Sequence, residues 1–117
     1  MECAYKNKED QAASSRRYYA RNRTKVIAAA SEARRRLRKS NRLLVGRHLS
    51  KNHCVDCGER DPIVLEFDHV RGVKKDNISN MVGNGVSTEI IVAEIAKCEV
   101  RCANCHRRAT AMRRMAA

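Results

Sequence analysis

Four of the six cysteines in this chain form two short-spaced pairs, Cys54-x2-Cys57 and Cys102-x2-Cys105. A Cys-x2-Cys loop presents two thiolates to one ion, and two such loops supply the four ligands of a tetrahedral zinc site. In a protein with reduced thiols, these pairs bind metal more often than they form disulfides. The spacing therefore predicts one structural zinc ion held by all four cysteines. Such an ion is coordinatively closed, so any catalysis must come from other residues.

A second group of residues could carry out chemistry. Asp68 and His69 end an apolar run, and His106 follows the last paired cysteine. A zinc ion that joins the two pairs would bring His106 near the end of that run. A carboxylate and an imidazole can hold a divalent cation and leave coordination positions for water and phosphate oxygens. A neighbouring neutral histidine could then take a proton from the attacking water, as phosphodiester hydrolysis requires.

The alternative is a purely structural role, in which Asp68 and His69 are only the polar end of a strand. Adjacent strand residues point to opposite faces of a sheet. The two side chains can therefore act on one phosphate only if the strand breaks or twists at that point.

The elements that must position these residues suggest an α+β fold. Residues from about Asn7 to His48 contain no proline and no glycine before Gly46, which favours one long helix or two helices in series. One face of this helix is expected to dock against the domain through an apolar stripe. The stripe consists of Val26, Ala30, Ala33, Leu37 and Leu44.

Beyond the knuckle around Cys54, the β-branched and aromatic residues of the 63–70 run predict a strand, and residues 99–101 a short strand that pairs with it. Residues 71–86 are expected to form an extended polar loop. Ser87 is a candidate N-cap for a short helix that buries Ile91, Ile95 and Cys98. A final basic helix is expected from Ala103 onward, and Cys3 is expected to be an exposed thiol.

The charge of the chain indicates a polyanionic partner. It has 25 Lys and Arg against 13 Asp and Glu, and residues 11–51 hold 13 basic residues and one acidic residue, Glu32. An excess confined to one segment favours nucleic acid, although charge alone does not separate RNA from DNA. The residues expected to contact DNA are Arg34, Arg35, Arg36, Arg38, Lys39, Lys74, Lys75, Arg107 and Arg108. With no signal peptide and no membrane-spanning run, a cytoplasmic location is expected.

The segment from Cys54 to Thr110, with its motifs CVDCG, LEFDHV and KCEVRCANCHRRAT, resembles the HNH endonucleases. The similarity is to the zinc-stabilised, cysteine-containing group that is common in bacteriophages. It implies a ββα-metal (His-Me finger) core in residues 52–117, with residues 1–51 as a basic helical arm. By this resemblance Asp68 and His106 hold a catalytic Mg²⁺ or Mn²⁺. His69 is then the general base in the hydrolysis of double-stranded DNA.

Lys97 stands where the middle asparagine of the family motif usually lies, so another group would have to take its role. Asn104 is the nearest candidate, Asn77 and Asn80 are further ones, and a backbone carbonyl is another. The resemblance also suggests a bacterial host cell as the location, a phage DNA-processing or packaging machine as a partner, and a homodimer if both strands are cut. Two other functions stay open: a zinc knuckle that binds nucleic acid without cutting it, and a structural or regulatory subunit.

Overall fold

The computed structural model describes residues 8–117, so the expectation for Cys3 lies outside the described residues. Helix α1 (Lys8–Lys51) confirms the long basic helix. Acidic side chains in its first turn and basic ones in its last complement the helix dipole. The chain divides within this helix into two compact units, Met1–Arg35 and Arg36–Ala117. None of the helices among the described residues is long and apolar enough to cross a membrane.

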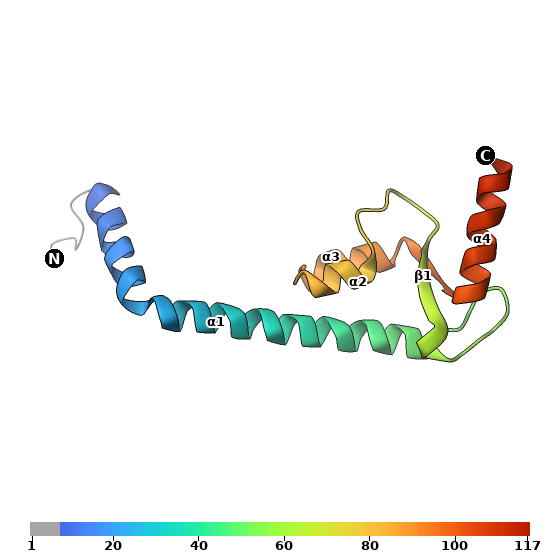
Figure 1. Cartoon of the computed structure of the whole chain (residues 1–117), viewed down its shortest axis with the longest axis horizontal. Coiled ribbons are helices and arrows are strands. Elements are labelled where there is room, and N and C mark those ends of the chain that lie inside the picture. The colour runs from blue at the N-terminus through green and yellow to red at the C-terminus, as the bar shows by residue number, and fades with distance from the viewer. Residues whose placement is uncertain (1–7) are drawn as a thin grey trace. The chain divides into compact units, whose positions relative to one another are not determined.

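The second unit has an α+β architecture with a small two-stranded sheet, as the sequence predicted (Figure 1). After α1 come the 3₁₀ turn η1 (Pro62–Val64), β1 (Leu65–His69), α2 (Ile78–Gly83), α3 (Thr88–Ile95), β2 (Cys98–Cys102) and α4 (Ala103–Ala116). The strands are antiparallel, and their register runs from Leu65 opposite Cys102 to His69 opposite Cys98. Helix α4 packs against both strands, and α2 and α3 lie side by side.

Three local expectations are corrected by this arrangement. The strand begins at Leu65 rather than at residue 63, because the Asp61 carboxylate accepts a hydrogen bond from the Ile63 N–H at 3.0 Å and starts a 3₁₀ turn. Cys98 is the first residue of β2 and not part of a helix face, since α3 ends at Ile95. The expected loop 71–86 contains α2, because its apolar side chains can be buried against α3.

The core of the second unit consists of two apolar clusters. One contains three of the paired cysteines together with Leu65 and Val100, and Leu49 of α1 packs against it. The other joins α2 and α3, and its members are Ile78, Met81, Val82, Ile91 and Ile95. The first cluster therefore places the cysteines at the centre of the packing around the sheet.

The apolar stripe predicted for α1 is wrong over part of its length. Leu44 packs against the second cluster, but Ala30 and Ala33 are exposed. The buried residue of α1 is the polar Asn41, whose amide donates to the Val86 carbonyl at 3.0 Å and accepts from the Thr88 hydroxyl at 2.7 Å. Hydrogen bonds, and not only apolar contact, therefore attach the end of α1 to the α2–α3 pair.

Candidate metal centre and adjoining cleft

The first cysteine pair lies on a tight knuckle between α1 and β1. The Cys54 N–H donates to the Glu59 carbonyl at 2.8 Å, and the Gly58 N–H donates to the Cys54 carbonyl at 2.9 Å. Gly58 has a φ of +80°, a conformation that side chains rarely tolerate. The Val55 N–H also bonds the Val100 carbonyl at 3.0 Å, which fastens the knuckle to β2. Local hydrogen bonds thus shape the knuckle, and the bond to β2 holds the first pair beside the second.

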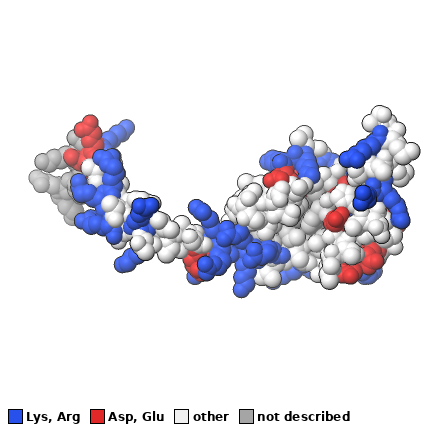
Figure 2. All heavy atoms as spheres, viewed as in Figure 1, with Lys and Arg blue, Asp and Glu red and all other residues white. Residues whose placement is uncertain are grey.

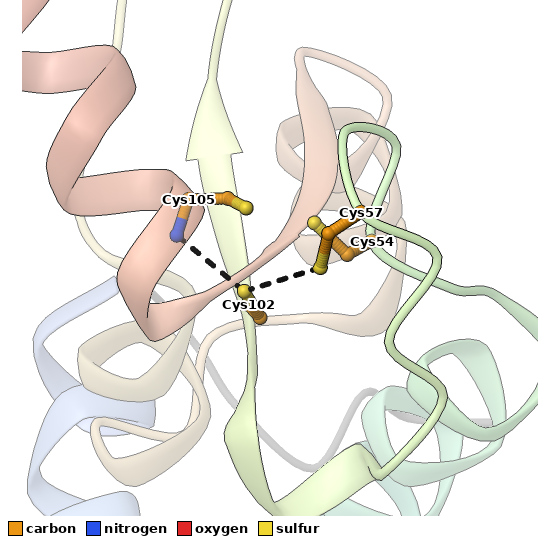
Figure 3. Close-up of side chains that lie close together, drawn as sticks. All are labelled: Cys54, Cys57, Cys102 and Cys105. Atoms are coloured by element: carbon orange, nitrogen blue, oxygen red, sulfur yellow. Dashed lines mark hydrogen bonds between the residues drawn. The ribbon is translucent and has the colours of Figure 1, made fainter.

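All four paired cysteines converge on one point, as Figure 3 shows. Their sulfur atoms lie within 4.8 Å of one another, and the Cys57 and Cys102 sulfurs are 3.7 Å apart. A tetrahedral zinc ion with bonds of about 2.3 Å sets its sulfurs roughly 3.8 Å apart. The Cys105 N–H also points at the Cys102 sulfur at 3.4 Å. The cluster fits a zinc ion, and it is the only group of three or more potential ligands within residues 8–117.

The electrostatics of the cluster indicate why a cation suits it. Burial raises the pKa of the Cys54 thiol, but backbone N–H groups of Cys102, Cys57 and Asp56 outweigh this and lower it to about 6. The neighbouring Cys102 sulfur and burial raise the pKa of Cys105 to about 12. Without a positive ion, four close sulfurs cannot all be ionised. A divalent cation removes that conflict, since zinc binds cysteine as the thiolate.

A second polar centre surrounds the buried carboxylate of Asp68 on β1. Arg101 donates to its Oδ2 at 2.6 Å, and Arg113 donates to Oδ1 and Oδ2 at 2.9 and 2.7 Å. Burial raises the pKa of Asp68, but the hydrogen bonds and charge of Arg113, with smaller contributions from His106 and Arg101, hold it below its ordinary value. Arg101 also bonds Asp56 at 2.8 Å, so one guanidinium links the cysteine knuckle to this carboxylate.

The structure brings His106 to Asp68, as the cysteine pairs predicted. In the first turns of α4, the His106 Nε2 atom lies 3.5 Å from Asp68 Oδ1, and its Nδ1 atom lies 3.0 Å from Glu66 Oε1. Nε2 and Asp68 Oδ1 could share one cation, because neighbouring donors around an octahedral ion with bonds of about 2.1 Å are roughly 3 Å apart. Nδ1 points away from that position and pairs with Glu66 instead. Glu66 was missed by the sequence reasoning, although its i, i+2 relation to Asp68 on a strand placed both side chains on one face.

His69 is placed differently from its neighbour. Strand β1 continues without a break to His69, and the His69 Nε2 atom lies 3.0 Å from Glu94 Oε2 on α3. Asp68 faces α4, so the two side chains take opposite sides of the sheet and the local distortion considered from the sequence is absent. His69 nevertheless lines a cleft of about 360 Å³ together with Glu66, Asn77 and His106. The geometric condition set from the sequence for Asp68 and His69 to act together is therefore not met along the strand. The two histidines, but not Asp68, line the same cleft.

The candidates for the middle asparagine lie at different places. Asn77 lines the cleft beside His69, whereas Asn104 is exposed in the first turn of α4 and is not among the lining residues. The Asn80 amide donates to the Asp76 carboxylate at 3.1 Å. Lys97 donates to the Glu94 carboxylate at 2.8 Å and to the Val73 carbonyl at 2.7 Å. Of the three asparagines, Asn77 is therefore the one that borders the cleft.

The basic residues expected to contact DNA are mostly exposed. Figure 2 shows Lys and Arg over much of the visible surface of α1, with few acidic side chains among them. The exposed members are Arg34, Arg35, Arg36, Lys39, Lys74, Lys75, Arg107 and Arg108, and Arg38 is half-buried. One of them, Arg107, also lines the shallow pocket beside Glu66 and His106. Positive charge thus extends to the border of the candidate site.

Comparisons with protein-family models, with curated proteins and with solved structures find no match to this chain.

Proposed function

We propose that this protein is a metal-dependent endonuclease of the HNH type, with a ββα-metal core made of β1, β2 and α4. The observation that carries the proposal is the 3.5 Å approach of His106 to the buried Asp68. His106 and His69 both line the adjoining cleft. A carboxylate and an imidazole at this separation suit a divalent cation that leaves positions for phosphate oxygens. The four-cysteine cluster supports the proposal because it fixes the start of α4, and with it His106, beside the strand.

In this proposal each residue has a separate task. Asp68 and His106 hold Mg²⁺ or Mn²⁺, which would neutralise charge on the phosphate and the leaving oxygen. His69 accepts the proton of the attacking water at its free ring nitrogen. Arg113 now occupies both oxygens of Asp68. Arg113 must break its hydrogen bond to at least one of these oxygens before a cation can bind there. The Arg113 guanidinium would then be free to bind a phosphate.

Asp68→Asn should lower metal-dependent cleavage by roughly 10²-fold or more, because an amide is a poor ligand for a hard cation and also unpairs two guanidinium groups. The measurement is relaxation of supercoiled plasmid with Mg²⁺ or Mn²⁺, with a parallel reaction in excess EDTA. Glu99→Gln is the matched control, since Glu99 lies opposite Asp68 in the sheet and also pairs with Arg101. Equal cleavage by both variants would refute the role of Asp68.

A second candidate function is a zinc knuckle that binds nucleic acid without hydrolysing it. The specific observation in its favour is that Arg101 and Arg113 already satisfy both oxygens of Asp68, as in a purely structural ion-pair network. The same plasmid assay separates the two functions. Binding with no metal-dependent cleavage would favour the knuckle, whereas cleavage that EDTA abolishes and Mn²⁺ or Mg²⁺ restores would favour the nuclease.

The basic segment of α1 provides a prediction that either function shares. Replacing Arg34, Arg35, Arg38 and Lys39 with glutamine keeps helix propensity but removes positive charge. Each lost phosphate contact should reduce the slope of log K against log salt by roughly 0.9, because fewer counterions are released. Fluorescence anisotropy on a duplex at several salt concentrations measures this slope. Ala28→Gln with Ala29→Gln, at exposed neutral positions of the same helix, is the control; an unchanged slope in the charge variant would exclude this segment as the interface.

A further inference from the structure

The α3 residue Glu94 is a buried carboxylate to which the proposed reaction gives no task. Its side chain is 1 % exposed, although charged side chains are rarely buried unless they are paired. It faces the end of β1, the segment that follows β1 and the turn between α3 and β2. Every polar neighbour named below contacts it from one of these three places.

The hydrogen bonds of Glu94 are divided between its two oxygens. Oε1 accepts from the Lys97 ammonium group at 2.8 Å, whereas Oε2 accepts from the Lys75 backbone N–H at 2.9 Å and faces His69 Nε2 at 3.0 Å. The Lys97 hydrogen bond, followed by the Lys75 N–H, lowers the pKa of Glu94 to about 2. Glu94 is therefore an ionised group that can only accept hydrogen bonds.

This geometry determines which nitrogen of His69 can carry the proton. A neutral imidazole has one N–H and one bare nitrogen, and the hydrogen bond at one nitrogen sets the state of the other. Because an ionised carboxylate has no hydrogen to donate, the nitrogen 3.0 Å away must be Nε2–H. We propose that Glu94 is a positioning residue that keeps His69 in the Nε2–H form and leaves Nδ1 bare as the proton acceptor.

The inference rests on the proposed function for the use of Nδ1 as the base, but the tautomer itself does not depend on that function. Lys97 stands where the middle asparagine usually lies in the family that this chain resembles. Among the described residues, its ammonium group donates to Glu94 and to the Val73 carbonyl rather than to His69. The task of orienting the base would thus have moved from an asparagine to a carboxylate. Lys97 would in turn hold that carboxylate ionised and in place.

Glu94→Gln tests the inference because it keeps size while one oxygen becomes an N–H donor. Lys97 is charged and competes best for the remaining oxygen, so the amide N–H₂ should turn toward His69, and the Lys75 N–H then loses its acceptor. Nε2 must then accept a hydrogen bond, which favours the Nδ1–H tautomer and removes the bare acceptor. Histidine ¹⁵N shifts of the labelled full-length, zinc-loaded protein in alkaline buffer report the tautomer, with His69→Asn used to assign the resonance. Glu89→Gln, at an exposed carboxylate of the same helix, is the matched control.

The unaltered protein should show His69 as Nε2–H, and Glu94→Gln should shift it toward Nδ1–H and slow plasmid cleavage by at least about 10²-fold. Glu89→Gln should change neither. An Nδ1–H tautomer in the unaltered protein overturns the inference, and so does a Glu94→Gln variant in which only one of the two readouts changes. If the variant does not fold, the tautomer of the unaltered protein decides. If the unaltered protein does not cut DNA, the proposed function fails, and the two tautomer measurements still decide whether Glu94 sets the proton of His69.

Discussion

Cys57→Ser is expected to unfold the 36–117 unit. Cys57 is exposed, so it contributes little to packing and its loss should matter only through the metal. Structural zinc in small domains contributes an apparent binding free energy of about 10–16 kcal/mol, comparable with or larger than the whole stability of a typical domain. The variant should lose its stoichiometric zinc in elemental analysis. It should also lose the cooperative thermal transition seen by circular dichroism.

Cys98→Ser is the control for this experiment. Cys98 is a half-buried thiol outside the cluster, whose sulfur donates to the Glu94 carbonyl at 3.5 Å. Serine can make the same hydrogen bond, so this variant should retain zinc and a cooperative transition. A strong chelator added to the unaltered protein should reproduce the effect of Cys57→Ser. If Cys57→Ser melts like the unaltered protein while holding no zinc, the metal is not what stabilises this fold.

The contrast between the two centres explains what the sequence could and could not predict. The Cys-x2-Cys spacing is a local signal, because each loop fixes its two sulfurs by itself. Once both pairs are placed on one ion, the position of His106 beside β1 follows from its adjacency to Cys105. The strands, α3 and α4 were recognisable from periodicity and caps in the same local way. For the cysteine pairs and His106, one long-range assumption was needed, namely that both pairs bind the same ion.

The polar partners within the second unit had no such local signal. Glu94 contacts His69 from 25 positions further along the chain, and Arg113 contacts Asp68 from 45 positions further. In the sequence, Arg113 is one of many basic residues on a basic helix, and Glu94 is an ordinary charged residue of a short helix. Which of these residues turns inward depends on how α3 and α4 pack on the sheet. The helix α2 escaped recognition for the same reason, because its three buried residues are buried only through their contact with α3.

His69→Ala should lower plasmid cleavage by roughly 10²–10⁴-fold, the range attributed to a general base. Zinc content and the midpoint of thermal unfolding should change little, because Glu94 keeps its hydrogen bonds from Lys97 and from the Lys75 N–H. DNA affinity should also be retained, since phosphate contacts come mainly from arginine and lysine side chains. His53→Ala, at an exposed histidine outside the cleft, is the matched control and should cleave like the unaltered protein.

Added imidazole makes this last test specific for proton transfer. The substitution leaves space at the cleft that Glu66, Asn77 and His106 also line, so a free imidazole molecule can enter where the His69 ring was. Cleavage by His69→Ala should then rise with imidazole concentration, whereas cleavage by Asp68→Asn should not, because imidazole cannot replace a hard carboxylate ligand. Undiminished cleavage in His69→Ala without imidazole would remove His69 from the reaction. A nucleophilic water would then have to be activated by another group, and Glu66, the carboxylate among the residues that line the cleft, would be the residue to substitute next.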